Sequence, residues 1–174
     1  MITKWNFQTP TEEELHKRDR LASQLGLSPV VCLLLVQRGL TTVEEVKKFF
    51  KPSLNDLHDP FLMPDMEKAV KRLNKALGNK EKILIYGDYD VDGTTAVSLV
   101  YKYLRPYSSA LDYYIPDRYD EGYGISYKGI NYARENGITR VISLDCGIKA
   151  IEKIEYAKQL GIDFIICDHH MPDD

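Results

Sequence analysis

Four short apolar runs, separated by segments with helical patterning, dominate the second half of this 174-residue sequence. The runs lie at 82–86, 111–115, 140–144 and 163–167. Helices are expected between them, at 94–104, 126–135 and 149–160. Because strands that alternate with helices are joined by crossovers, the pattern predicts an α/β fold with a mainly parallel sheet and flanking helices. The runs do not alternate polar and apolar residues, so both faces of this sheet should be covered.

The region before the first apolar run reads as helical. Thr11 precedes three glutamates, which suit a helix N-terminus. Pro29 and the capping-box sequence 42–45 mark two further helix starts, and Asp65 can cap a fourth helix. We therefore expect a small helical N-terminal region, interpreted as a packing module, followed by the α/β domain, with bounds at 1–80 and 81–174.

Composition excludes several classes of protein. Hydrophobic residues make up 44% and charged residues 28% of the chain, which is too apolar for a disordered protein. The longest apolar run, Val30–Val36, is far shorter than the roughly 20 residues of a membrane-spanning helix. The formal net charge of −3 is unlike that of a strongly basic nucleic-acid binder. With no apolar signal segment at its start, the chain is expected to be cytoplasmic.

The three cysteines do not form a recognisable framework. Their number is odd and no C-x-x-C spacing occurs, which argues against a disulfide scaffold or a zinc ribbon. We expect Cys146 and Cys167 to be small buried residues at strand ends rather than metal ligands.

Acidic and imidazole side chains follow three of the four predicted strands. The segment 88–93, Asp-Tyr-Asp-Val-Asp-Gly, comes directly after the first strand, and Asp145 follows the third. Asp168, His169 and His170 follow the fourth. Since the carboxyl ends of parallel strands line one crevice, these side chains should converge. Taken singly, each segment also reads as an ordinary turn or strand end.

A cluster of this kind requires protons or cations. Two carboxylates roughly 5 Å apart repel by about 3 kcal/mol at an effective dielectric constant near 20. Oxygen and imidazole ligands suit Mn²⁺ or Mg²⁺ first and Zn²⁺ less well. The potential ligands are too many for one small ion, so a two-metal site is expected, with Asp145 as the candidate bridging ligand.

Two other interpretations of the first segment remain at this point. It begins like a calcium loop, but Leu99 occupies the position where that loop needs glutamate. It also resembles the D-x-D-G-T motif of haloacid-dehalogenase-type phosphatases, with Asp90 as the nucleophile. That alternative leaves His169 and His170 without a role.

The three motifs together resemble the first three motifs of the DHH phosphoesterase superfamily. Within it, the sequences 86–95 and 115–126 look most like those of exonucleases that degrade single-stranded DNA from 5′ to 3′. The resemblance covers about 83–172. It implies a phosphodiesterase of DNA repair and recombination that uses two Mn²⁺ or Mg²⁺ ions, with single-stranded DNA as its substrate. It also suggests single-strand-binding protein and a recombination helicase as partners.

The same resemblance assigns roles position by position. Asp90 and Asp92 resemble metal ligands, Asp145 the bridging ligand and His169 a ligand of the second ion. His170 resembles the histidine that faces the scissile phosphate. Asp88 is expected at or near the metals, and Asp168 is expected to orient the histidines. Possible DNA contacts near the loop after the second strand are Arg118, Tyr123 and Lys128, which read equally well as ordinary surface residues.

Some parts of the family pattern fall outside these residues. The family has a further ligand aspartate and a second domain with a glycine-rich motif, and the exonucleases also carry an OB-fold. We therefore expect 81–174 to be a partial DHH domain in an N-terminal fragment of weak or no activity by itself. Alternative activities are phosphodiester hydrolysis of oligoribonucleotides or cyclic dinucleotides, and a regulatory metal- or nucleotide-binding module without catalysis is a further possibility.

Overall fold

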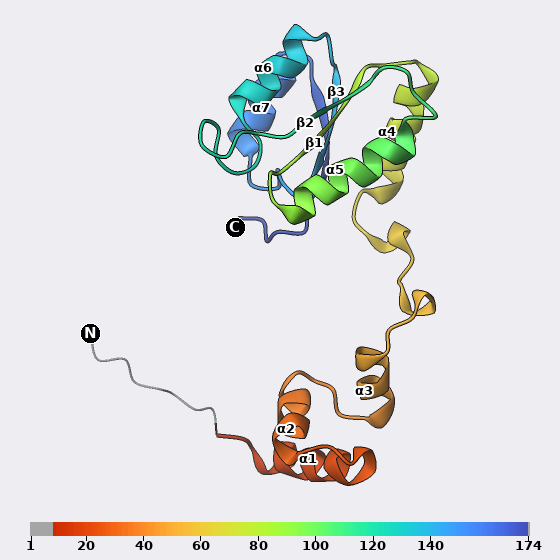
Figure 1. Cartoon of the computed structure of the whole chain (residues 1–174), viewed down its shortest axis with the longest axis vertical. Helices are drawn as coiled ribbons and strands as arrows, with labels where there is room; N and C mark the ends of the chain where they lie inside the picture. The colour runs from red at the N-terminus through yellow and green to blue at the C-terminus, as the bar shows by residue number, and fades with distance from the viewer. Residues whose placement is uncertain (1–8, 174) are drawn as a thin grey trace, which may run out of the picture. The chain divides into compact units, whose positions relative to one another are not determined.

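The computed structural model describes residues 9–173, which divide after Asp59 into two compact units (Figure 1). The first unit holds α1 (Glu12–Leu25), α2 (Pro29–Gln37), α3 (Val43–Phe50) and a short 3₁₀ helix, η1 (Leu54–Asp56). Its core residues are Leu21, Cys32, Leu35, Val36 and Val46.

Side-chain caps fix where the helices of the first unit begin. Thr11 accepts a hydrogen bond from the backbone of Glu14 at the start of α1, and Thr42 does the same with Glu45 at the start of α3. Both glutamates return a bond to the cap backbone, which completes two capping boxes. The apolar run Val30–Val36 lies within α2, and none of the described helices is both long and apolar enough to cross a membrane.

The second unit is a four-stranded sheet with helices on both faces (Figure 1). Its strands are all parallel, in the order β2-β1-β3-β4. The bounds are η2 (Pro60–Leu62), α4 (Met66–Gly78), β1 (Ile83–Gly87), α5 (Val91–Leu104), β2 (Leu111–Tyr114), α6 (Tyr127–Glu135), β3 (Arg140–Leu144), α7 (Ile151–Gln159) and β4 (Asp163–Cys167). The predicted α/β class and parallel sheet are confirmed. The strand order reverses between β1 and β3, which is where an open parallel sheet forms its crevice.

The two faces of the sheet bury different side chains of the same strands. Leu84 and Tyr86 of β1 pack with residues of α6 and α7, whereas Ile83 and Ile85 pack with residues of α4 and α5. All five residues of β1 and of β3 are buried, as expected for strands covered on both faces. Strand β4 is at the edge and is partly exposed. The expectation that Cys167 is buried was therefore wrong, although Cys146 is buried.

The start of α5 and the cap of α4 differ from the sequence-based expectation. Helix α5 begins at Val91 rather than Thr94, because the Asp90 carboxylate caps it by accepting a hydrogen bond of 2.9 Å from the Gly93 amide. Asp65 precedes α4, but its backbone is left-handed, with φ of 60°, and its side chain makes no capping bond.

The first turn of α5 lies directly against the end of β1, and a glycine makes this approach possible. A Cβ atom added to Gly93 would lie 2.4 Å from the carbonyl oxygen of Asp88 and 2.6 Å from its nitrogen. Both contacts are with backbone, which cannot move aside as a flexible side chain would.

We expect Gly93→Ala to destabilise the fold by about 1–3 kcal/mol, the usual range for overpacking a tight site. The measurement is the free energy of unfolding in urea. Gly78→Ala in α4 is the matched control, because a Cβ atom there meets nothing within 4 Å. It should raise stability by about 0.5 kcal/mol through helix propensity. Equal stability of Gly93→Ala and the unchanged chain would contradict the close approach of α5 to β1.

Candidate metal centre

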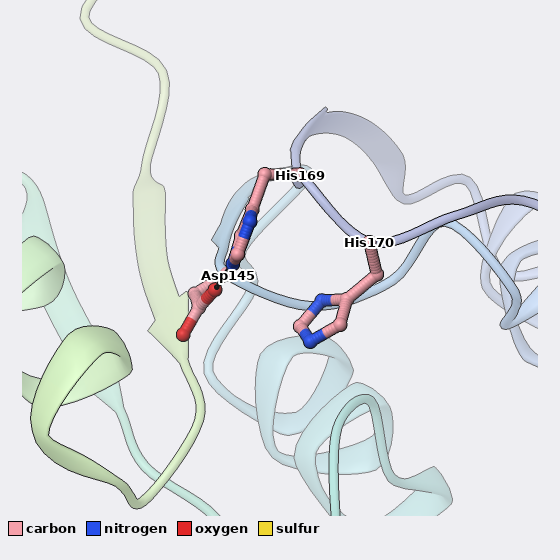
Figure 2. A group of neighbouring side chains, drawn as sticks. All are labelled: Asp145, His169 and His170. Carbon is pink, nitrogen blue, oxygen red and sulfur yellow. Dashed lines mark ion pairs between the residues drawn. The ribbon is translucent and has the colours of Figure 1, made fainter. Parts of the chain in front are cut away.

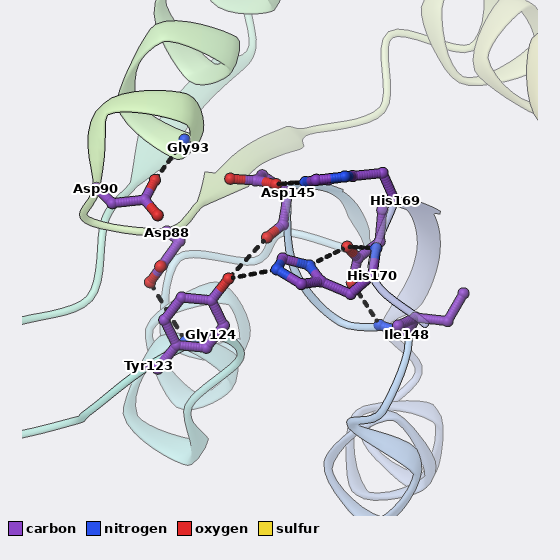
Figure 3. A network of polar contacts seen from close by, with 10 residues as sticks. Asp88, Asp90, Gly93, Tyr123, Gly124, Asp145, Ile148, His169 and His170 are labelled. Atoms are coloured by element: carbon purple, nitrogen blue, oxygen red, sulfur yellow. Dashed lines mark hydrogen bonds and ion pairs between the residues drawn. The ribbon is translucent and has the colours of Figure 1, made fainter. Parts of the chain in front are cut away.

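The three acidic strand ends meet at one edge of the sheet. Asp88 follows β1, Asp145 follows β3 and Asp168 follows β4, and these strands are neighbours in the order β1-β3-β4. The amide of Asp145 donates a hydrogen bond of 2.8 Å to the carbonyl of Cys167, which extends the pairing of β3 and β4 by one residue. The side chains from all three ends therefore face one space (Figure 3).

Asp145, His169 and His170 form the tightest group. Each offers one ligand atom, and these atoms all lie within 4.8 Å of one another (Figure 2). His169 Nε2 lies 3.0 Å from Asp145 Oδ1. Asp145 has a left-handed backbone, with φ of 61°, a conformation that aspartate tolerates better than most residues. Carboxylate and imidazole atoms from two strand ends are thus brought together.

Asp168 is not part of this group but forms hydrogen bonds with His170. Its side chain is almost fully buried and accepts hydrogen bonds of 3.0 Å from the amides of Ile148 and His170. It also contacts His170 Nδ1 at 2.6 Å. Burial alone would raise the pKa of Asp168, but these bonds outweigh burial and lower it. The bond to Asp168 raises the pKa of His170.

Asp88 is the fully buried acid of the site. One carboxylate oxygen accepts a long hydrogen bond, 3.3 Å, from the Gly124 amide, and Oδ2 has no hydrogen-bond partner among the described residues. Burial raises the pKa of Asp88, and the carboxylates of Asp90 and Asp145 add to the increase. An anion in this position is destabilised until a cation or a proton compensates it.

Asp90 and Asp92 belong to α5 and are placed differently. Asp90 caps the helix through Gly93 and interacts electrostatically with Asp88 and His170 at the same edge (Figure 3). Asp92 is an exposed residue of the first turn. It lies outside the three-residue group whose ligand atoms are within 4.8 Å.

Of the three possible DNA contacts, Tyr123 directly contacts the group formed by Asp145, His169 and His170. The Tyr123 hydroxyl lies 3.2 Å from His170 Nε2. Burial, followed by the nearby carboxylates, raises the pKa of Tyr123 to about 12. The guanidinium of Arg118 lies 5.1 Å from the centre of the Tyr89 ring, which in turn meets the Tyr123 ring edge-on. Lys128 instead lines a separate hollow of about 540 Å³ beside α6.

A buried hydrogen-bond network that sequence reasoning missed anchors the loop before α6. The Tyr86 hydroxyl donates 2.9 Å to the Gly124 carbonyl and accepts 3.0 Å from the Ser126 amide. Glu121 accepts bonds from Tyr114 and Ser126. The network holds Gly124 against Asp88. The only sequence signal for it was a tyrosine at the end of an otherwise aliphatic strand.

We expect Asp88→Asn to stabilise the metal-free chain at neutral pH. Because the pKa of Asp88 is higher in the folded than in the unfolded state, its ionised form destabilises the fold, and this penalty disappears as the pH falls through that pKa. The gain should be on the order of 1 kcal/mol, the usual cost of a buried acceptor without a donor. It is measured by urea unfolding at neutral and acidic pH without divalent ions. Asp120→Asn, at an exposed acid, should change stability by less than about 0.5 kcal/mol. A loss of stability in Asp88→Asn at neutral pH would contradict this account.

Comparisons with known proteins agree with this geometry. Residues 82–174 match the DHH family, N-terminal domain. The exonuclease RecJ of Bacillus subtilis, described as specific for single-stranded DNA, is 40% identical over 97% of the chain. RecJ of Escherichia coli is 33% identical over 85% of the chain. These alignments span 21% and 25% of the two relatives, so the chain covers about a fifth to a quarter of their length.

Solved structures show the same relationship. A RecJ exonuclease bound to manganese aligns with 65% of this chain and 30% of its own, with a TM-score of 0.59 and 29% identity. RecJ of Thermus thermophilus in complex with Mn²⁺ has the same fold, with a TM-score of 0.64 and 23% identity over 91% of this chain and 22% of its own. The haloacid-dehalogenase alternative, with Asp90 as nucleophile, is not supported. With its motifs at three adjacent strand ends and a matching family profile, the chain belongs to the DHH family.

Proposed function

We propose that this chain is the metal-binding part of an exonuclease that removes nucleotides from the 5′ end of single-stranded DNA, using two divalent ions. The observation that carries the proposal is the convergence of Asp145, His169 and His170 beside the buried Asp88. The RecJ relatives supply the substrate class, since their names describe exonucleases specific for single-stranded DNA.

The residues present suit Mn²⁺ or Mg²⁺. Oδ2 of Asp88 is a buried oxygen without a hydrogen-bond partner among the described residues, which suits a place beside a cation. The surrounding donors are carboxylate oxygens and imidazole nitrogens, the ligands that hard and borderline divalent ions prefer. Cys146 is buried and does not belong to the group of close ligand atoms. Burial raises the pKa of its thiol to about 12.

Each residue has a role in the proposal. Asp145 would be the ligand shared by the ions and His169 would be a ligand of the second, and the ligand atoms of this pair lie 3.0 Å apart. Asp90 and Asp92 would complete the ligand set from the start of α5, with Asp88 at or near the ions. His170 faces the scissile phosphate. Asp168 orients His170 through its bond to Nδ1, an arrangement typical of the partners of functional histidines.

The ions, when bound, supply charge stabilisation to the phosphoryl oxygens and activate the attacking water. The side chains of the protein position the groups that act on the substrate. Asp168 holds the His170 ring beside Asp145 and His169, where the imidazole can stabilise developing charge or move a proton. Arg118, held over the Tyr89 ring, offers a cation to the DNA backbone. Lys128 faces the other hollow and has less support as a DNA contact.

The wider assignments are also part of the proposal. The sheet domain, 81–174, carries the chemistry, and the helical region, 1–80, is an accessory to it. The structure groups α4 with the sheet. A role in DNA repair and recombination, a cytoplasmic location, and the two protein partners, single-strand-binding protein and a recombination helicase, stay predictions.

Metal binding predicts a thermal shift. Mn²⁺ at about 100 times its Kd should stabilise the chain by about 2.7 kcal/mol, because it binds the folded state only. Differential scanning fluorimetry with and without Mn²⁺ measures the rise in Tm. Asp145→Asn, which keeps a residue that tolerates the left-handed backbone, should abolish most of the rise. Asp120→Asn should keep it. An unchanged Tm at millimolar Mn²⁺ would contradict the proposed metal site.

A nuclease assay tests the reaction in the complete protein that contains this chain. The protein should release mononucleotides from 5′-labelled single strands and leave blunt duplexes and cyclic dinucleotides intact. Asp145→Asn should lower kcat by at least ~100-fold, as expected when charge stabilisation in the transition state is lost. Faster turnover of dinucleotides than of long strands would instead favour a phosphodiesterase of short oligonucleotides.

A further inference from the structure

Tyr123 occupies a central place in the candidate site, between the two strand ends that carry the histidines and Asp145. Its hydroxyl lies 3.2 Å from His170 Nε2 and 3.5 Å from the carbonyl oxygen of Asp145 (Figure 3). Its ring meets the His170 ring edge-on, with centroids 6.0 Å apart and an interplanar angle of 86°. The side chain thus contacts His170 through both its hydroxyl and its ring.

The His170 ring is held at both of its nitrogens. Asp168 contacts Nδ1 at 2.6 Å, so the carboxylate accepts the Nδ1 hydrogen of the ring. In the neutral ring Nε2 then has a lone pair, and the Tyr123 hydroxyl is the donor within reach. Removing the hydroxyl leaves one fixed nitrogen, about which the ring can turn.

Little else restrains this ring. The His170 side chain is 40% exposed, and the residues that follow it, 171–173, are also exposed. The neighbouring His169 ring lies 4.8 Å away at a tilt, but its own side chain is 76% exposed. The orientation of His170 therefore depends on Asp168 and Tyr123.

Tyr123 is half exposed, and its neighbours hold it in place. Its ring packs edge-on against Tyr89, with centroids 6.1 Å apart. The next residue, Gly124, donates its amide to Asp88 and receives the Tyr86 hydroxyl at its carbonyl. The tyrosine is thus tied to β1, whereas His170 follows β4.

We propose that Tyr123 is a positioning residue, whose hydroxyl hydrogen-bonds Nε2 and so fixes the orientation of the His170 ring beside Asp145 and His169. This inference rests on the proposed function for its consequence in turnover, but its structural content is independent of activity. It gives Tyr123 a different role from direct contact with DNA.

The structural part is tested by NMR of the ¹⁵N-labelled chain without metal, at one fixed alkaline pH. The ring nitrogens of His170, assigned with His170→Asn, should show a hydrogen on Nδ1 and a hydrogen-bonded Nε2. Tyr123→Phe should shift the Nε2 resonance toward that of a free imidazole and leave the Tm nearly unchanged. Tyr119→Phe, which removes a hydroxyl from a 92% exposed ring of the same loop, should leave both unchanged. An Nε2 resonance that is identical in Tyr123→Phe and the unchanged chain overturns the proposal.

The kcat and KM of Tyr123→Phe distinguish a positioning role of Tyr123 from a role in DNA binding. In the complete protein, Tyr123→Phe should lower kcat by roughly three- to tenfold with little change in KM, the effect of losing one hydrogen bond that acts in the transition state. A rise in KM at constant kcat would mean that Tyr123 binds DNA and would overturn the positioning role. If the unchanged protein hydrolyses no single-stranded DNA while the NMR shift occurs, the proposed function fails and the placement of His170 by Tyr123 stands.

Discussion

The repulsion among carboxylates at the ends of β1 and β3 is the constraint on which the rest of this structure depends. Asp88 is fully buried, and one of its oxygens has no hydrogen-bond partner in the part of the chain that the structure describes. Asp90 and Asp145 raise its pKa further. The fold keeps these charges together because β1 is buried on both faces and α5 approaches Asp88 through Gly93. Packing energy elsewhere in the sheet offsets this repulsion. A bound divalent cation would replace the repulsion with attraction between the cation and the carboxylates. The apo fold is therefore less stable than its core alone would make it.

Strands were easier to predict from the sequence than helix starts. The bounds of β3 and β4 match the apolar runs at 140–144 and 163–167, since burial in a parallel sheet demands continuous apolar stretches. The start of α5 was misplaced because the acids around it read as a loop of ligands, whereas Asp90 also caps the helix. Asp65 shows the reverse case, a residue with the right chemistry whose left-handed backbone prevents capping.

The sheet topology was enough to predict that the site residues lie close together. It was not enough to predict which of their side chains contact one another. Once β1, β3 and β4 are parallel neighbours, the residues after them must meet at one edge. Nothing in the sequence marks the contact of Tyr123 with His170, which are 47 positions apart and are joined only by the course of the loop before α6. Lys128 was chosen for its nearness in sequence to that loop, but helix α6 carries it to another hollow.

The anchoring of this loop by Tyr86 has a consequence for how the site moves. Connections as long as the one between Tyr114 and Tyr127 usually open independently and exchange their amide hydrogens quickly. Here the Gly124 carbonyl is bonded to a tyrosine of the most buried strand, whose hydroxyl also receives the Ser126 amide. Opening the loop requires breaking these buried hydrogen bonds to Tyr86. We therefore expect the part of the loop beside Asp88 to stay in place as a fixed wall of the site, and not to move as a flap.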